Sequence, residues 1–145
     1  MAQSGKTEKR PSPCNCLNLR RASLTITKLY DDFLFPSGLT VGQYGLLRHL
    51  RVLGPLSVSA LAEKVRLDRT TLVRNLAPLE KAGLIEDISA PGARERALKL
   101  TDQGIGKCEI AEPFWNEAQY HVEQVLGVEN LDILMTLLQR VENLR

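Results

Sequence analysis

Residues 67–80 carry the clearest hydrophobic pattern of the chain, with apolar side chains spaced along one face of a helix. The apolar stripe consists of Leu72, Leu76 and Leu79, with Val73 beside them. Asp68 is placed to cap this helix, because its carboxylate can accept from the free N–H groups of the first turn and faces the positive end of the helix dipole. The pattern therefore predicts a helix that buries its leucines.

The opposite face of this helix is polar. It carries Thr71, Arg74, Asn75 and Pro78, with Arg69 and Thr70 at its leading end. Arginine can pair bidentately with guanine, asparagine with adenine, and threonine offers a hydroxyl and a methyl group. Such a face is suited to reading bases in a DNA major groove, although any solvated helix face can also be polar. The flanking segments decide between these interpretations.

A shorter amphipathic helix is expected just upstream, over residues 58–65. Its apolar positions recur at i, i+3, i+4 and i+7, and Ser57 can cap it after a turn at residues 54–57. Only residues 66–68 separate this helix from the next one. The two helices must therefore cross steeply, as in a helix-turn-helix.

A β-hairpin is expected directly downstream. Gly83 ends the helix, residues 84–89 and 95–100 have strand character, and residues 90–94 form the tip between them. Helix, turn, helix and hairpin together make a winged helix. Arg94 lies at the tip, where one cation can enter a minor groove and its concentrated negative potential.

Two more helices are predicted next to this module. Thr40 and Gln43 form a capping box before a helix that runs to about residue 53. Thr101 caps a long helix that runs to about residue 126, and Pro113 inside it should produce a kink, because it removes one backbone hydrogen bond.

The first and last helices, from about residue 15 to 32 and after Gly127, are apolar on more than one side. A helix of that kind is buried by more than one neighbouring surface. The economical solution is an isologous homodimer in which the terminal helices of two subunits interdigitate.

Charge is distributed unevenly along the 145 residues, although the net charge is only +2. Basic residues outnumber acidic ones by six to one in residues 1–28 and by eight to six in residues 57–100, whereas residues 101–145 carry three basic and eight acidic residues. This polarity would orient the winged helix toward a phosphate backbone. Residues 1–13 are polar and basic, and we expect a flexible arm there.

No stretch of the sequence is typical of a membrane span or a signal peptide, so we expect a cytoplasmic protein without a membrane partner. Three cysteines, an odd number, argue for reduced thiols over a disulfide framework. No hydrolase, kinase, phosphate-loop or dinucleotide motif is present, and we expect no catalytic activity, no cofactor and no metal. His49 and His121 each fit a partly buried polar residue on an amphipathic helix better than a metal ligand.

Four blocks of the sequence resemble, in order, the signature blocks of the MarR family of bacterial transcriptional regulators. They are SVSALA at residues 57–62, LDRTTL at 67–72, LEKAGLI at 79–85 and LTDQG at 100–104. The resemblance implies a mainly α-helical domain over residues 14–145. Within it, a winged helix-turn-helix with a small β-hairpin wing at about 40–101 is flanked by dimerisation helices at about 15–35 and 102–145.

A two-fold dimer of this kind is expected to bind a pseudo-palindromic double-stranded operator, with half-sites about one helical turn apart. The residues expected at the DNA are Thr70, Thr71, Arg74 and Asn75 for base reading, Arg69 and Ser57 for phosphates, and Arg94 and Arg96 on the wing. In the family an aspartate usually stands two residues before the wing arginine, and here that position is Gly92.

Cys14 and Cys16 lie at the start of the first helix, where the helix dipole and the nearby Arg20 and Arg21 favour a thiolate. Such a thiolate could oxidise to a sulfenic acid. Cys16 and Tyr30 are also spaced like the reactive cysteine and one tyrosine of the family's organic-hydroperoxide-sensing branch, whose second tyrosine would fall at Val41. Cys108 could act as a resolving thiol. The alternatives are packing of the thiols at the dimer seam and metal capture by the Cys-x-Cys pair.

The family resemblance also implies a pocket for a small phenolic or aromatic ligand where the winged helix meets the dimerisation helices. The residues that could line it are Arg21, Thr25, Tyr44, Leu47 and Phe114. A role in the core explains the same residues.

The sequence thus predicts a homodimeric DNA-binding regulator, most simply a repressor released by a small ligand or by thiol oxidation. One alternative is a winged helix that contacts only proteins, which would favour exposed aromatic or aliphatic anchors over a Thr/Arg/Asn face. The other is a thiol-based peroxide reductase built on Cys16.

Overall fold

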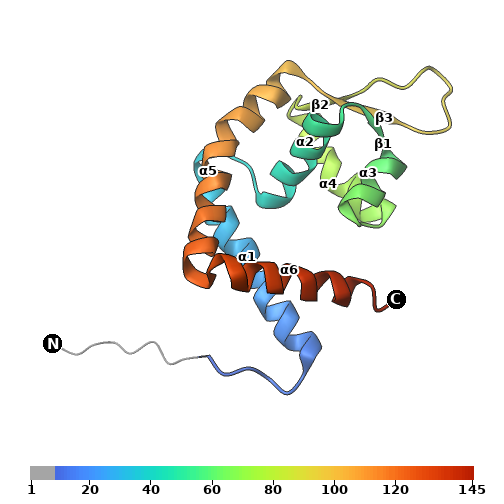
Figure 1. Cartoon of the computed structure of the whole chain (residues 1–145). Helices are drawn as coiled ribbons and strands as arrows, with labels where there is room; N and C mark the ends of the chain where they lie inside the picture. Colours follow the sequence, from blue (N-terminus) through green and yellow to red (C-terminus); the bar gives the residue numbers. More distant parts are fainter. Residues whose placement is uncertain (1–8) are drawn as a thin grey trace.

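Helices account for most of the computed structural model, which describes residues 9–145 (Figure 1). The elements in chain order are α1 (Asn15–Leu34), the 3-10 turn η1 (Phe35–Ser37), α2 (Val41–Leu53), β1 (Leu56–Ser57), α3 (Val58–Val65), α4 (Arg69–Lys81), β2 (Ile85–Asp87), β3 (Ala97–Leu100), α5 (Asp102–Leu126) and α6 (Val128–Glu142). The predicted winged helix, mainly α-helical with a small β-sheet, is confirmed. Of the predicted N-terminal arm, residues 1–8 lie outside the described residues.

The predicted helix caps are present. The Asp68 carboxylate accepts from the N–H of Thr71 at 2.9 Å, and the Ser57 hydroxyl accepts from the third residue of α3 at 3.0 Å. Thr40 and Gln43 form the reciprocal capping box before α2. The Thr101 hydroxyl accepts from the first turn of α5 at 3.1 Å. Each cap satisfies an N–H that the helix itself leaves without a partner.

The small sheet differs from the sequence prediction in two ways. Residues 54–57, predicted as a turn, end in a short strand β1, in which Leu56 pairs with Leu98 and Ser57 with Ala97. The hairpin strands β2 and β3 are shorter than the predicted 84–89 and 95–100. All pairs are antiparallel, in the order β1-β3-β2. A strand of two residues is too short to show an alternating pattern in the sequence. It is defined only by its pairing with β3.

The core lies between α2, α3, α4 and the inner face of the sheet. The side chains of Leu72 and Leu76 are fully buried, and Leu79 is 2 % exposed. Val73 was predicted beside this stripe, but it is 41 % exposed. It lies about 100° around the helix axis from Leu72, at the margin of a stripe only one leucine wide.

Helices α1, α5 and α6 form a frame beside the helix-turn-helix (Figure 1), in which α5 packs along α1 and against α6 and also contacts α2 of the winged helix. Only Leu34 is buried in α1, and no residue of α6 is buried. Ile133, Leu137 and Val141 are among the apolar side chains of α6 that remain at least 40 % exposed in the single chain. None of the helices described between residues 9 and 145 combines the length and apolarity that crossing a membrane requires.

The start of α5 packs unusually closely against the wing. A Cβ added to Gly104 would lie 2.0 Å from the carbonyl oxygen of Leu84, which is backbone and cannot rotate away. Gly106, one half-turn later, has open space around the same position. We expect Gly104→Ala to lower the free energy of unfolding by about 1–3 kcal/mol through overpacking.

The matched control is Gly106→Ala, which should raise the free energy of unfolding by about 0.5–1 kcal/mol because alanine favours the helix. Urea unfolding followed by circular dichroism at one fixed protein concentration measures both. Equal effects of the two substitutions would show that the contact with Leu84 is not tight.

Candidate nucleic-acid interface

Helix α4 presents a row of polar side chains to solvent. Arg69, Thr70, Arg74 and Asn75 are all exposed. Thr70 and Arg74 lie opposite the buried leucine stripe, whereas Arg69 and Asn75, each three residues from Leu72, flank it on its two sides. Because the buried leucines fix the rotation of α4 about its own axis, these polar side chains are held facing solvent. They carry the donors and acceptors that match base edges and phosphates.

Thr71, also expected at the bases, is half-buried at the start of the same helix. Its hydroxyl donates to the Asp68 carboxylate at 2.7 Å, while its N–H donates to the other carboxylate oxygen. These two hydrogen bonds lower the pKa of Asp68, the bond from the Thr71 side chain most. Thr71 therefore stabilises the helix start, and its methyl group and remaining lone pair are what it can offer to a ligand.

A second cluster joins the N-termini of α3 and α4 to the wing. The Glu95 carboxylate accepts from the N–H of Ser59 at 2.7 Å. The Arg69 guanidinium lies 3.4 Å from the Ser59 hydroxyl and 3.8 Å from Glu95. Ser57, next to this cluster, is half-buried and uses its hydroxyl oxygen as the α3 cap.

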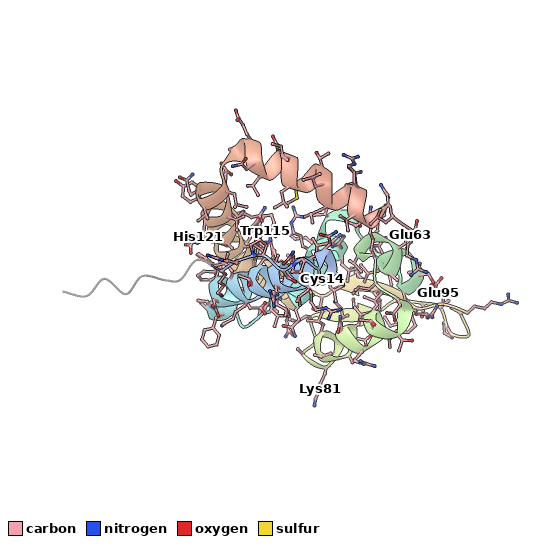
Figure 2. All side chains as sticks on the ribbon, turned by 90° about the horizontal axis from the view of Figure 1, so that it is seen from below. Cys14, Glu63, Lys81, Glu95, Trp115 and His121 are labelled. Atoms are coloured by element: carbon pink, nitrogen blue, oxygen red, sulfur yellow. The ribbon has the colours of Figure 1, made fainter. Side chains whose placement is uncertain are left out.

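Glu95 was not identified from the sequence, where it appears only as an acidic residue between two arginines. Figure 2 shows it at the base of the projecting hairpin, on the side of α3. Hydrogen bonds from Ser59, and then the charge of Arg69, lower the pKa of Glu95. Its carboxylate is thus the natural counter-ion of Arg69 in the absence of DNA.

The two wing arginines have different surroundings. Arg94 is exposed beyond a turn closed by the Ala93 N–H to the Ala90 carbonyl at 3.0 Å, and Gly92 adopts a φ of +78° in that turn. Arg96 is half-buried at the wing root and pairs with the carboxylates of Glu80 and Asp87. Among the ion pairs found within residues 9–145, none includes Arg94.

Cys14 and Cys16 are both exposed at the start of α1. The Arg20 guanidinium lies 3.9 Å from the Cys16 sulfur, and Cys14 is the N-cap residue without a side-chain cap bond. Cys108 is 1 % exposed in the core face of α5, and burial raises the pKa of its thiol. Within one chain Cys108 is therefore not accessible as a resolving thiol. Tyr30 donates to Gln119 of α5, and burial raises its pKa.

The five residues expected around a ligand pocket differ in their surroundings within the single chain. Tyr44 and Leu47 are buried in the core, where the Tyr44 ring lies 5.9 Å from that of Trp115. Arg21 and Thr25 are exposed on α1, and Phe114 is half-buried. Tyr44 and Leu47 thus contribute to the packing of the core.

The fold and this surface define a winged helix-turn-helix protein with an outward-facing recognition helix. The profile described as the MarR family matches residues 39–91. An HTH-type transcriptional regulator of Bacillus cereus, itself uncharacterised, is 32% identical over 126 residues, which cover 86% of this chain and 84% of the relative. The chain belongs to the MarR family of transcriptional regulators.

Solved structures agree with this assignment. The Mycobacterium tuberculosis transcriptional regulator MosR in complex with DNA is 31% identical, with a TM-score of 0.79 over 91% of this chain and 98% of MosR. The Bordetella bronchiseptica regulator BpsR superposes with a TM-score of 0.81 over 94% of this chain and 98% of BpsR, but at 20% identity it supports the fold alone. The protein is a transcriptional regulator of MarR type.

The different burial of the three cysteines generates a direct prediction. In the native protein, Cys14 and Cys16 should react quickly with the thiol reagent DTNB, and Cys108 should react only after unfolding, because its thiolate is both scarce and enclosed. The absorbance of the released chromophore counts fast and slow thiols. A Cys108→Ala variant should keep both fast thiols and lose the slow one. Three thiols reacting at one rate would contradict the burial of Cys108.

Proposed function

We propose that this protein is a homodimeric, sequence-specific repressor that binds a pseudo-palindromic operator through a pair of α4 helices. The observation that carries the proposal is the outward row of Thr70, Arg74 and Asn75, held in place by fully buried leucines. The DNA complex of MosR, a relative at 31% identity, supports DNA as the partner.

The proposed roles follow from position. Arg74, in the middle of the exposed face, and Asn75, at its edge, read base edges together with Thr70 and Thr71 at the leading end. Arg69 and Ser57 lie beside the N-termini of α4 and α3, where phosphates bind favourably. Arg94 at the wing tip is directed to the minor groove and completes the proposed DNA contacts.

The second copy is proposed from the uncovered apolar faces of α1 and α6. No residue of α6 is buried within the single chain, and several of its leucine, isoleucine and valine side chains are largely exposed to solvent. A second copy of the same frame is the partner that covers both faces with one self-complementary interface. Two recognition helices related by a two-fold axis then reach two half-sites.

Selection of duplexes from a randomised library by the purified protein tests this proposal. We expect enrichment of a pseudo-palindrome. Arg74→Ala should then cost about 1–3 kcal/mol on the selected duplex and relax base preference at one position in each half-site, because it removes a bidentate hydrogen-bonded pair with a base.

Arg69→Ala is the matched comparison. It should weaken binding to all duplexes alike and reduce the slope of log K against log salt by about 0.9 for each phosphate that the protein no longer neutralises. Fluorescence anisotropy at several salt concentrations measures both variants. No duplex enriched at low salt would contradict DNA binding itself, and uniform weakening by Arg74→Ala would show that Arg74 binds a phosphate.

Thiol oxidation is a second proposed element, supported by the exposed Cys16 and the guanidinium 3.9 Å away. The Cys16 thiolate would attack one oxygen of an organic hydroperoxide and break the O–O bond. The sulfur then becomes a sulfenic acid, and the alkoxide leaves and takes up a proton as an alcohol. Oxidation at the start of α1 would alter the dimer frame that carries the recognition helices.

We expect one equivalent of cumene hydroperoxide to release the selected duplex and dithiothreitol to restore binding. Cys16→Ser should abolish the response, whereas Cys108→Ala should keep it because that thiol is enclosed. Binding indifferent to peroxide would assign the cysteines to packing and leave a small ligand as the releasing signal. Multiple turnovers of peroxide per subunit would instead indicate the thiol reductase.

A further inference from the structure

Arg96 lies on the side of the wing that packs against the helices. Side chains alternate along a strand, so Arg96 belongs to the same face as Leu98 and Leu100, which are 0% and 5% exposed. The backbone of Ile88 still donates to the Ala97 carbonyl at 2.8 Å, so the hairpin pairing reaches the residue next to Arg96. The Arg96 side chain thus projects from the inner face of the hairpin, at the end next to the wing tip.

The guanidinium of Arg96 joins two elements other than its own. Its Nη2 pairs with a carboxylate oxygen of Glu80, near the end of α4, and its Nε donates to the Asp87 carboxylate of β2 at 3.0 Å. The three side chains are only 37%, 30% and 35% exposed. A planar guanidinium can serve two carboxylates at once because its N–H groups point in different fixed directions.

Asp87 is held from a second direction as well. Its other carboxylate oxygen accepts from the N–H of Ser89 at 2.8 Å and from the Ser89 hydroxyl at 2.6 Å. These bonds lower the pKa of Asp87, so it remains an anion beside Arg96. The bridge formed by Glu80, Asp87 and Arg96 therefore connects α4, β2 and the residue that precedes β3.

Besides this bridge, the wing root is held by the contacts of Glu95 with Ser59 and Arg69 and by the Val58 N–H, which donates to the Arg96 carbonyl at 3.0 Å. Strand β2 has three residues and β3 has four, and residues 88–96 between them form no helix or strand. A hairpin with so short a ladder does not hold its own orientation in water. A small rotation at the root would move the tip and Arg94 by a larger distance.

We infer that Arg96 is a positioning residue whose bridge to Glu80 and Asp87 fixes the wing relative to the recognition helix. This inference rests on the proposed function, and it replaces the sequence-based expectation that Arg96 contacts DNA. The bridge sets the spacing between the tip arginine in the minor groove and the base-reading residues in the major groove. Arg96 thereby determines specificity at positions it does not touch.

The direction in which a substitution at Glu80 changes DNA affinity distinguishes a positioning role of Arg96 from a direct contact with DNA. Glu80 is an acidic residue on the recognition helix, and removal of a negative charge near DNA ordinarily strengthens binding. If Glu80 holds Arg96 and the wing in place, its removal should instead weaken binding. Glu80→Gln keeps the size of the side chain and removes only the charge.

The experiment compares Glu80→Gln, Arg96→Gln and the double variant on a duplex selected from a random library by the unaltered protein. Each single variant should bind this duplex about twofold to fivefold more weakly. The double variant should be no weaker than either single one, because both remove the same bridge. Arg96→Gln should leave the salt slope unchanged. Without DNA, hydrogen exchange of the wing amides of Ile88 and Ala93, which donate to the carbonyls of Ala97 and Ala90, should become faster in every variant.

Lys99→Gln, which removes an exposed cation from the outer face of the same strand, is the control and should leave wing exchange unchanged. The midpoint of urea unfolding, measured for each variant, checks that it is folded. If one variant does not fold, Asp87→Asn, which removes the other carboxylate of the bridge, takes its place. Tighter binding by Glu80→Gln, together with a salt slope reduced by about 0.9 in Arg96→Gln, would overturn the inference and show that Arg96 binds a phosphate. Failure of the unaltered protein to bind any duplex would instead refute the proposed function, and wing exchange would still test the bridge.

Discussion

The burial of three leucines along α4 is the constraint on which the rest of the interface depends. Leu72, Leu76 and Leu79 occupy one narrow stripe in contact with the core. Burial of each contributes about 1.5–3 kcal/mol, so rotation of the helix by even one residue would cost several such contributions. The setting of the helix is therefore fixed by packing, and the exposed arginine and asparagine point outward as a consequence.

The wing is positioned by a different kind of interaction. At its inner end, the Thr101 hydroxyl donates to the Gly83 carbonyl at 2.6 Å and the Thr101 N–H donates to the Leu84 carbonyl at 3.1 Å, where Gly104 permits the close approach of α5. At its outer end, Glu95 and Arg96 form polar bridges to α3, α4 and β2. The recognition helix thus depends on apolar packing, whereas the wing depends on hydrogen bonds and ion pairs that are partly exposed to solvent and salt.

This difference explains how much could be predicted from the sequence. Helices α2 to α4 and their caps were predicted because Thr40, Ser57 and Asp68 signal locally and leucines repeat with the helical period. The pairing of Leu56 with β3 was missed, since a strand of two residues has no period. The contacts of Glu95 and Arg96 were missed because they join positions far apart in the chain. The apolar face of α6 was also predictable from the sequence, but no other element of the single chain buries it.

The central claim is that two α4 helices, related by the symmetry of a dimer, are presented to DNA. Hydroxyl-radical footprinting of the purified protein on the DNA upstream of its own coding sequence tests it most directly. The account predicts two symmetric protected patches whose centres lie about one helical turn, roughly 10 base pairs, apart. A single asymmetric patch would contradict the symmetric pair, and an unprotected duplex at low salt would contradict recognition of DNA by α4.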